Sequence, residues 1–269
     1  MVHDELEEVK RIAREAGAIL LKHYTRSTSV EWKAPGDPVT VADHEASEYI
    51  VRELSRIFPE DGILSEELPD TSRRLSKSRV WMVDPMDGTR EFIAHRDEFA
   101  VMIGLAVDGV PSLGVVYQPA TDKLYSSRDG AGTFLDHQGR HDRLRVSSES
   151  VASRLTIAVS RSHSSSRIER ICNTMGIHQS IQTGSVGLKV GLIVEGKAHL
   201  YIQAGNQTQL WDTCGPEAIL REAGGRMSDI RGKPLLYTGS ELRNAHGVIA
   251  SNGTIHDRAS KVTQSVVFG

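Results

Sequence analysis

The sequence predicts a mixed α+β and α/β protein with two halves, residues 1–150 and 151–269. Three observations predict this class. Apolar residues recur at helical spacing near the N-terminus, short apolar runs separated by turn signals follow, and strand-like and helix-like runs alternate in the second half. The division between the halves falls in a polar, serine-rich stretch around 145–154.

Two amphipathic helices are expected first, at 3–24 and at about 41–57, because their apolar residues share one helical face. Between them, Pro35, Gly36 and Pro38 predict a segment without regular structure. The second helix is expected to stop at the Pro-Glu-Asp-Gly run that follows it.

An antiparallel sheet is expected next. A buried strand at 80–83 delivers Asp84 at its C-terminal end. The pair Asp108-Gly109 is typical of a tight hairpin between two long apolar runs. The further strands expected in this sheet are 99–107, 110–118, 122–127 and 132–135.

In the second half, strands and helices are expected in alternation. The Gly224-Gly225 pair is a typical helix stop. The expected strands are 155–159, 198–202 and 248–250, and the expected helices are 164–175, 185–194, 213–223 and one at the C-terminus.

The composition limits the possible partners. The net charge is −3 with 25% charged residues, so a dedicated nucleic-acid surface is not expected. No stretch is apolar enough to span a bilayer, and no secretory signal opens the chain. Cys172 and Cys214 have neither disulfide nor zinc spacing. We therefore expect a soluble cytoplasmic protein with no membrane partner.

The run from Asp84 to Thr89 is the strongest chemical signal. Asp84 and Asp87 follow a buried strand, and two carboxylates held together favour a hard divalent cation. Gly88 permits close approach of the backbone to a ligand, and Thr89 stands at the expected start of a helical turn, where free N–H groups bind anions. The alternative interpretation is an ordinary turn with aspartate as a helix cap.

Three other acidic segments gain meaning only together with this run. Glu66-Glu67 alone is typical of solvated surface. Asp212 alone fits a helix N-cap, and Asp43 fits a capping box with Thr40. The prediction of a metal site depends on all four segments occurring in one chain.

These segments together resemble the inositol monophosphatase superfamily of Mg²⁺-dependent, Li⁺-sensitive phosphatases, and the resemblance covers nearly the whole chain. It implies a layered αβαβα sandwich, as in the inositol monophosphatases and fructose-1,6-bisphosphatases. The matching segments are Asp37 to Asp43, Ser65-Glu66-Glu67, Val83 to Thr89, Trp211-Asp212-Thr213 and Glu222 to Gly225.

The resemblance implies a role for each matching residue. Two to three Mg²⁺ ions, with Mn²⁺ as a possible substitute, would be held by Glu66, Asp84, the carbonyl of Met86, Asp87 and Asp212. Thr89, bonded to Asp43, would orient and help deprotonate the attacking water, with Glu66 also counted as catalytic. The backbone of Gly88 and Thr89 would bind the phosphate, and Lys33 matches a lysine near it.

The second half implies the substrate. Inositol phosphatases carry a glutamate where this chain has Gln203, which weakens an inositol reading. The segments 160–163, 183–189 and 211–220 instead resemble the 3′(2′),5′-bisphosphate nucleotidases, including the bacterial CysQ type. His163, Ser185 and Lys189 would then line the nucleoside and its 5′-phosphate. As alternatives, Lys189 fits an exposed helix residue, and His163 and Ser185 fit helix caps.

The expected reaction is hydrolysis of 3′-phosphoadenosine 5′-phosphate, a by-product of sulfate activation, to AMP and phosphate. An inositol-1-phosphate or fructose-1,6-bisphosphate phosphatase is the alternative activity. A non-catalytic binding protein is disfavoured because Glu66, Asp84, Asp87, Thr89 and Asp212 are all present. A monomer and a homodimer both remain compatible with the sequence.

Overall fold

The computed structural model describes residues 4–24, 30–34, 37–161 and 166–269, with the backbone alone at 30–34 and 37–38. Its helices are α1 (Glu5–Tyr24), α2 (Val41–Ile57), α3 (Thr89–Ile93), α4 (Ser166–Met175), α5 (Val186–Val194), α6 (Leu210–Glu222) and α7 (His256–Phe268). Short 3₁₀ helices lie at η1 (Arg73–Ser76), η2 (Pro119–Thr121) and η3 (Ala152–Arg154).

Strands from residues 62–144 form one sheet, called the large sheet below, with the order β3-β4-β5-β6-β7-β8-β9. The pair β3–β4 is parallel and the other neighbours are antiparallel. The strands of the large sheet are β3 (Gly62–Ser65), β4 (Arg79–Asp87), β5 (Ala100–Val107), β6 (Val110–Gln118), β7 (Lys123–Arg128), β8 (Gly132–His137) and β9 (Arg140–Leu144).

Strands from residues 156–251 form the small sheet, with the order β11-β10-β12-β14-β13. Here β11, β10 and β12 run parallel, whereas β14 is antiparallel to both β12 and β13. The strands of the small sheet are β10 (Thr156–Ser160), β11 (Gln179–Thr183), β12 (Leu200–Gln203), β13 (Arg226–Ser228) and β14 (Val248–Ser251).

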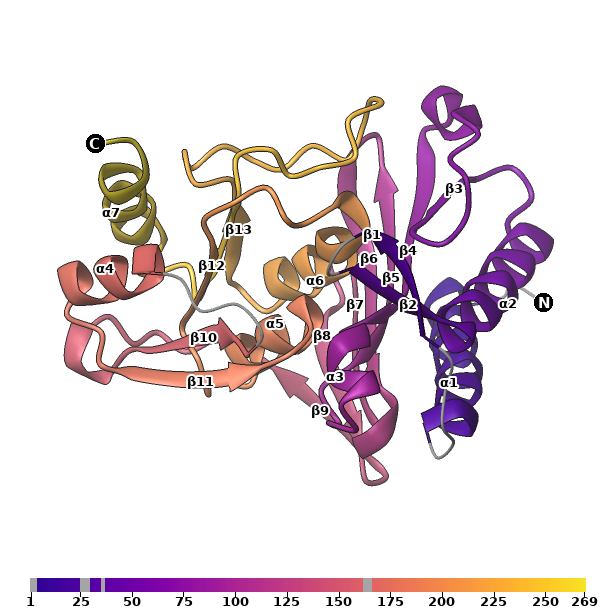
Figure 1. Cartoon of the computed structure of the whole chain (residues 1–269), viewed down its shortest axis with the longest axis horizontal. Coiled ribbons are helices and arrows are strands. Elements are labelled where there is room, and N and C mark those ends of the chain that lie inside the picture. Colours follow the sequence, from indigo (N-terminus) through magenta and orange to yellow (C-terminus); the bar gives the residue numbers. More distant parts are fainter. Residues whose placement is uncertain (1–3, 25–29, 35–36, 162–165) are drawn as a thin grey trace.

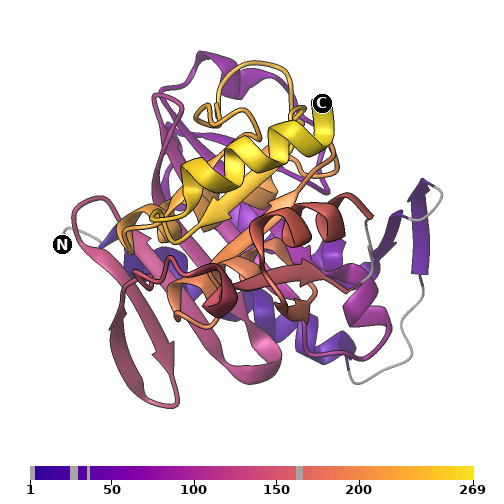
Figure 2. The ribbon, with the colours of Figure 1, turned by 90° about the vertical axis from the view of Figure 1, so that its left-hand side faces the viewer.

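The two sheets and their helices stack in five layers (Figure 1), and Figure 2 shows the molecule from the side of α4 and α7. Helices α1 and α2 cover the outer face of the large sheet, and α5 and α6 lie between the two sheets. Helices α4 and α7 cover the outer face of the small sheet. Each helix layer is held by a core of apolar side chains removed from water. The predicted αβαβα sandwich is therefore confirmed.

Helix α6 lies unusually close to the large sheet, and this closeness positions the site. A Cβ added at Gly104 or Gly114 would overlap the backbone of Gly215 in α6. Because these positions have no side chain, the helix can rest directly on β5 and β6. The first turn of α6 therefore comes near the end of β4.

Several sequence predictions are confirmed. Helix α2 spans the predicted residues, and α1 begins at Glu5 within its predicted range. The hairpin between β5 and β6 turns at Asp108 and Gly109, whose φ angles are +50° and +77°. Positive φ at both residues is what a tight hairpin turn requires.

Other predictions are wrong. The segment between α1 and α2 contains regular structure, because β1 (Val30–Ala34) pairs antiparallel with β2 (Asp37–Thr40). Helix α6 begins at Leu210, three residues before the predicted start, and Asp212 in its first turn accepts from the N–H of the N-cap residue Gln209. The assignment of residues 1–150 and 151–269 to separate domains stays a prediction.

A further prediction concerned membranes. Within the described residues, no helix combines the length and the apolar character that crossing a bilayer requires.

Candidate active site

Strand β4 brings Asp84 and Asp87 to one cavity. The sequence predicted Asp84 at the end of the strand, but β4 continues through Asp87. Residues three apart on a regular strand point to opposite faces of a sheet. The pairing of β4 with β5 is irregular between Asp84 and Asp87, and such an irregularity re-aims side chains. Both carboxylates therefore line the same cavity.

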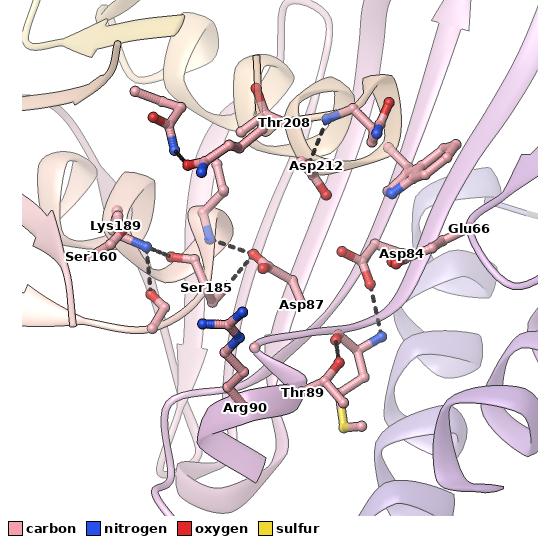
Figure 3. A pocket seen from close by; sticks show the side chains of 18 of the residues that line it. Glu66, Asp84, Asp87, Thr89, Arg90, Ser160, Ser185, Lys189, Thr208 and Asp212 are labelled. Carbon is pink, nitrogen blue, oxygen red and sulfur yellow. Dashed lines mark hydrogen bonds between the residues drawn. The ribbon is translucent and has the colours of Figure 1, made fainter. Parts of the chain in front are cut away.

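This cavity, called the acidic cavity below, has a volume of about 640 Å³ and lies between the two sheets. Figure 3 shows Glu66, Asp84, Asp87 and Asp212 around the same space. Glu66 directly follows β3, and Asp212 lies in the first turn of α6. Four acidic residues that are far apart in the sequence thus meet at one place, as predicted.

Backbone and hydroxyl donors fix one oxygen of each aspartate. The N–H of Met86 donates to Asp84 Oδ1 over 2.9 Å, and the N–H of Gln209 donates to Asp212 Oδ2 over 2.6 Å. Asp87 Oδ2 accepts from Ser185 Oγ over 2.7 Å. The same oxygen accepts from N–H groups at the start of α5, from Val186 and Gly187. The alternative interpretation of Asp212 as the N-cap of α6 is wrong, because Gln209 holds that position.

Burial and mutual repulsion disfavour the charged forms of these acids. The pKa of Asp84 is raised well above its ordinary value, first by burial and then by the charges of Glu66, Asp87 and Asp212. The pKa of Asp212 is raised for the same reasons. Burial also raises the pKa of Asp87, although the ammonium of Lys189 opposes the shift.

The donor set fits a hard divalent cation. It consists of carboxylate oxygens with the carbonyl of Met86 nearby, and Mg²⁺ and Mn²⁺ prefer oxygen ligands. Burial and the neighbouring acidic charges raise the pKa values of Asp84 and Asp212. A bound cation would relieve this repulsion among the acids.

As the side chains lie, the described part of the chain holds no group of three or more His, Cys, Asp or Glu side chains close enough to bind a metal ion. A shared ion would therefore require side-chain rotations within the acidic cavity.

Thr89 and Asp43 form a hydrogen-bonded pair beside the acids. Thr89 Oγ1 lies 3.2 Å from Asp43 Oδ1 and 3.2 Å from the carbonyl oxygen of Met86, so its hydroxyl can donate to either. Asp43 Oδ2 accepts from the N–H and the hydroxyl of Thr40, at 2.7 and 2.6 Å. Asp43 is 2% exposed, and burial raises its pKa to about 6 despite these donors. Asp43 therefore completes the capping box of α2 with one oxygen and accepts from Thr89 with the other.

Gly88 is the N-cap of α3, with a φ of +104°. A Cβ at this position would lie 2.7 Å from the carbonyl oxygen of Glu98, so the turn requires glycine. The first N–H groups of α3 have no acceptor within the helix, so they are available to a ligand.

Ser185 and Lys189 also line the acidic cavity. Ser185 caps α5, as one interpretation proposed, because its Oγ accepts from the N–H of Leu188. The interpretation of Lys189 as an exposed residue is wrong, since it is only 3% exposed. Its Nζ donates to the carbonyls of Gly184 and Ser185 at 3.0 and 2.9 Å, and burial lowers its pKa.

Two predicted substrate residues are not seen in full. His163 lies outside the described residues, and the side chain of Lys33 in β1 does as well. Gln203, at the end of β12, does line the cavity.

The sequence did not single out several cavity residues. Arg90 points into the acidic cavity in Figure 3, and its position directly after Thr89 was a usable signal. Arg161 lies in the segment 160–163, which resembles the bisphosphate nucleotidases, but the sequence assigned this arginine no role. Arg243 comes from the loop before β14, and no pattern in its part of the sequence pointed to a site. A β-bridge with Gln209 holds it beside the start of α6.

Comparisons with known proteins agree with this site. The sequence profile of the inositol monophosphatase family matches residues 3–267. A protein named 3′(2′),5′-bisphosphate nucleotidase CysQ from Escherichia coli K12 is 37% identical over 239 residues, 88% of this chain and 95% of that protein. One of the same name from Haemophilus influenzae is 33% identical over 92% of this chain and 93% of its own length.

Solved structures show the same fold. An IMPase from Thermotoga maritima is 28% identical and superposes with a TM-score of 0.84, covering 98% of each chain. CysQ from Bacteroides thetaiotaomicron is also 28% identical, with a TM-score of 0.78 over 93% of this chain and 98% of that one. The chain therefore belongs to the inositol monophosphatase family and is a phosphatase.

Proposed function

We propose that this phosphatase is a Mg²⁺-dependent 3′(2′),5′-bisphosphate nucleotidase that hydrolyses 3′-phosphoadenosine 5′-phosphate to AMP and phosphate. The observation that carries the proposal is the convergence of four carboxylates and the Thr89–Asp43 pair on one cavity. The names of the relatives support the nucleotide substrate. Gln203 supports it too, because a glutamine there lacks the charge that the resemblance assigns to inositol phosphatases.

The metal would be held by the acidic side chains of the cavity. Two to three Mg²⁺ ions, or Mn²⁺ in their place, would bind Glu66, Asp84, Asp87, Asp212 and the carbonyl of Met86. When bound, these ions supply a water that loses its proton near neutral pH and positive charge for the reacting oxygens. The donors on Asp84, Asp87 and Asp212 occupy one oxygen of each carboxyl group and leave the other oxygen available to a cation.

Thr89 and Asp43 would position the attacking water. The Thr89 hydroxyl donates its own proton toward Asp43, so its lone pairs are free to accept a proton from water. The raised pKa of Asp43, about 6, makes its carboxylate a better proton acceptor than an ordinary aspartate. The N–H groups of Gly88 and Thr89 would bind the phosphate oxygens.

The remainder of the substrate would lie along the side of the cavity formed by the small sheet and α5. Ser185, Lys189 and His163 would line the nucleoside and its 5′-phosphate, and Lys33 would lie near the scissile phosphate. The buried Lys189 would act mainly through its charge, because its Nζ already donates to two carbonyls. We also propose a cytoplasmic location and a monomeric or homodimeric state.

A substrate panel tests the proposal. Purified protein with Mg²⁺ is assayed on 3′-phosphoadenosine 5′-phosphate, inositol 1-phosphate and fructose 1,6-bisphosphate. We expect kcat/KM for the nucleotide to exceed the other two values by about tenfold or more, because the nucleoside with its 5′-phosphate would make contacts that neither other substrate can make. A matched preparation of Asp87→Asn measures phosphatase carried over from the host. A preference for inositol 1-phosphate would overturn the nucleotide assignment.

A further inference from the structure

An ion pair at the rim of the acidic cavity joins segments that are distant in the sequence. Glu98 precedes β5, whereas Arg161 follows β10 and lines the cavity. Arg161 donates from Nε to Glu98 Oε2 over 2.9 Å and from Nη2 to Glu98 Oε1 over 2.6 Å. Such a two-bond pair between arginine and a carboxylate fixes orientation as well as distance.

The same carboxylate holds the loop before α5. The N–H of Gly184 donates to Glu98 Oε2 over 2.9 Å, and Arg161 Nη2 donates to the carbonyl of Gln182 over 3.1 Å. The two backbones are also in close contact, because a Cβ on Gly184 would lie 2.5 Å from the Glu98 carbonyl oxygen. Glu98 therefore fixes the position of Gly184 through both its side chain and its backbone.

Ser185, the next residue, has an unfavourable backbone conformation. Its φ is +45°, in the left-handed region that residues with side chains rarely adopt. Such conformations persist only where the surroundings hold them. In this conformation Ser185 Oγ donates to Asp87 Oδ2, and the N–H groups of Val186 and Gly187 donate to the same oxygen.

We propose that Glu98, paired with Arg161, is a positioning residue that keeps Ser185 and the N-terminus of α5 directed at Asp87. The inference rests on the proposed function, because Asp87 serves there as a ligand of the cation. Without the carboxylate, the two-bond pair with Arg161 is lost, and the strained backbone of Ser185 loses a restraint. The donors on Asp87 then become mobile, and its carboxylate loses its fixed orientation.

A second ion pair offers a matched control. Asp61 accepts from Arg79 Nε over 3.0 Å and from Trp81 Nε1 over 2.9 Å, so it also combines arginine with another N–H donor. This pair lies at the N-terminal end of β4, the opposite end from Asp87. Asp61→Asn therefore measures the cost of losing such a pair without disturbing α5.

The experiment compares Glu98→Gln, Arg161→Gln, the double variant and Asp61→Asn with the unmodified chain. Steady-state kinetics use whichever of the three phosphate esters the unmodified enzyme hydrolyses fastest, so that a wrong nucleotide assignment does not affect the result. Amide hydrogen exchange of the segment 183–188 is measured on metal-free protein. Arg161→Lys, which keeps the charge, is the milder variant if Arg161→Gln does not fold.

We expect Glu98→Gln to lower kcat by about ten- to a hundredfold, with KM changed by less than about threefold, as a displaced catalytic group does. Exchange in segment 183–188 should rise about tenfold or more, and Arg161→Lys should lose less activity than Glu98→Gln. The double variant should be no worse than Glu98→Gln alone, because both substitutions break one unit. Asp61→Asn should change neither kcat nor this exchange.

An unchanged kcat in Glu98→Gln would overturn the proposal, as would unchanged exchange in segment 183–188 or fully additive losses in the double variant. Equal losses in Glu98→Gln and Asp61→Asn would also overturn it, because they would show a general effect on stability.

Discussion

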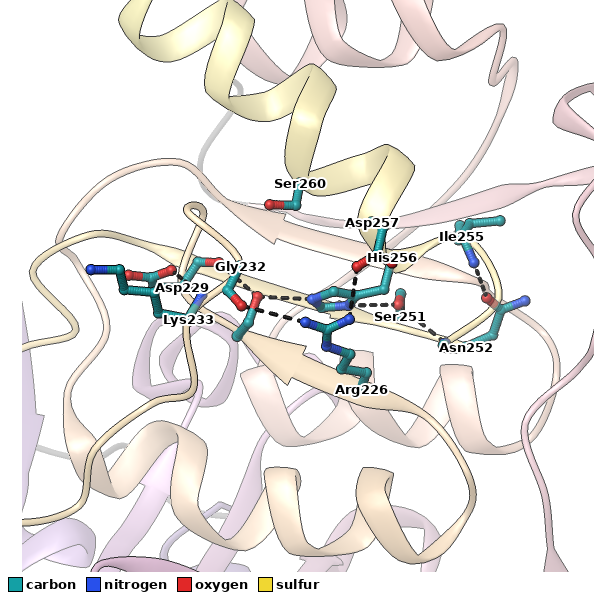
Figure 4. Close-up of polar contacts among 12 residues, drawn as sticks. Arg226, Asp229, Gly232, Lys233, Ser251, Asn252, Ile255, His256, Asp257 and Ser260 are labelled. Carbon is teal, nitrogen blue, oxygen red and sulfur yellow. Dashed lines mark hydrogen bonds and ion pairs between the residues drawn. The ribbon is translucent and has the colours of Figure 1, made fainter.

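The acidic cavity and the cluster around His256 both bury ionisable side chains, but their surroundings differ. In the acidic cavity, burial and the charges of neighbouring acids raise the pKa values of Asp84 and Asp212. The cluster around His256, called the His256 cluster below, consists of His256, Ser228 and Ser251 at the small sheet. Figure 4 labels His256 and Ser251. In the first region charges repel, and in the second every ring nitrogen has a neutral partner.

The hydrogen bonds assign the proton on His256. Ser228 Oγ donates to the carbonyl of Asp229 over 2.7 Å, so its proton is already used. His256 Nε2 must therefore donate to Ser228 Oγ over 2.8 Å, and Nδ1 accepts from Ser251 Oγ over 2.9 Å. Burial, with the charge of Arg226, lowers the pKa of His256 to about 4. The ring is neutral and fully bonded.

The contrast separates a structural cluster from a candidate catalytic one. A buried polar group with all its partners rigidifies the fold, whereas buried like charges cost free energy unless a ligand neutralises them. The acidic cavity has buried like charges of this kind, and the His256 cluster has none. The predictions below follow from this difference.

The largest expected effect is on Asp87. Asp87→Asn should lower kcat by about a thousandfold or more, because a bound cation contributes several kcal/mol to the barrier reduction. The fold should persist, since the asparagine oxygen still accepts from Ser185 and α5. Turnover and circular dichroism check this. Full turnover would contradict the metal assignment.

A smaller loss is expected at Thr89. Thr89→Ala should reduce kcat by about a hundredfold, within the range for a positioned proton-transfer group. Thr89→Ser keeps the hydroxyl that donates to Asp43 and is the matched control, with an expected loss below about tenfold. Equal rates for the two variants, measured at saturating Mg²⁺, would show that the hydroxyl has no catalytic part.

The smallest expected effect concerns the His256 cluster. The pKa of His256 is lower in the folded chain than its ordinary 6.5. The contribution of the neutral, buried ring to the free energy of unfolding is therefore complete above pH 6.5 and declines as the pH falls toward 4. The slope approaches about 1.4 kcal/mol per pH unit, because the unfolded chain takes up the proton first. Urea unfolding of the unmodified chain and His256→Gln should diverge accordingly. Parallel pH curves would refute the role of His256, and kcat should be unaffected.

The sequence predicted the layers but missed the sheet edges. Strands β3, β9, β11 and β13 were not predicted as strands, and they are the outer strands of the two sheets. An edge strand has a neighbour on one side only and shows a weak apolar pattern. In β11, for example, Gln179, Ser180 and Gln182 are exposed. Their pairing depends on partners that no local pattern reveals.

The candidate site was predictable where residues form local runs. The sequence predicts a site at the segment from Asp84 to Thr89 with Glu66, Asp43 and Asp212, and the fold brings these residues together. The burial of Lys189 was not foreseen, because a lysine is usually exposed even where its neighbours along the chain are apolar. The pair of Glu98 and Arg161 joins residues 63 positions apart, and only the stacking of the two sheets brings them together.

The most direct test of the central claim is the thermal midpoint as a function of Mg²⁺ concentration. Binding to the folded chain raises its stability as the logarithm of ligand concentration. We predict that Mg²⁺ raises the midpoints of the unmodified chain and of His256→Gln in parallel, and raises that of Asp212→Asn far less. An unmodified chain that Mg²⁺ does not stabilise, or an equal rise in Asp212→Asn, would contradict the claim that the acidic cavity binds the cation.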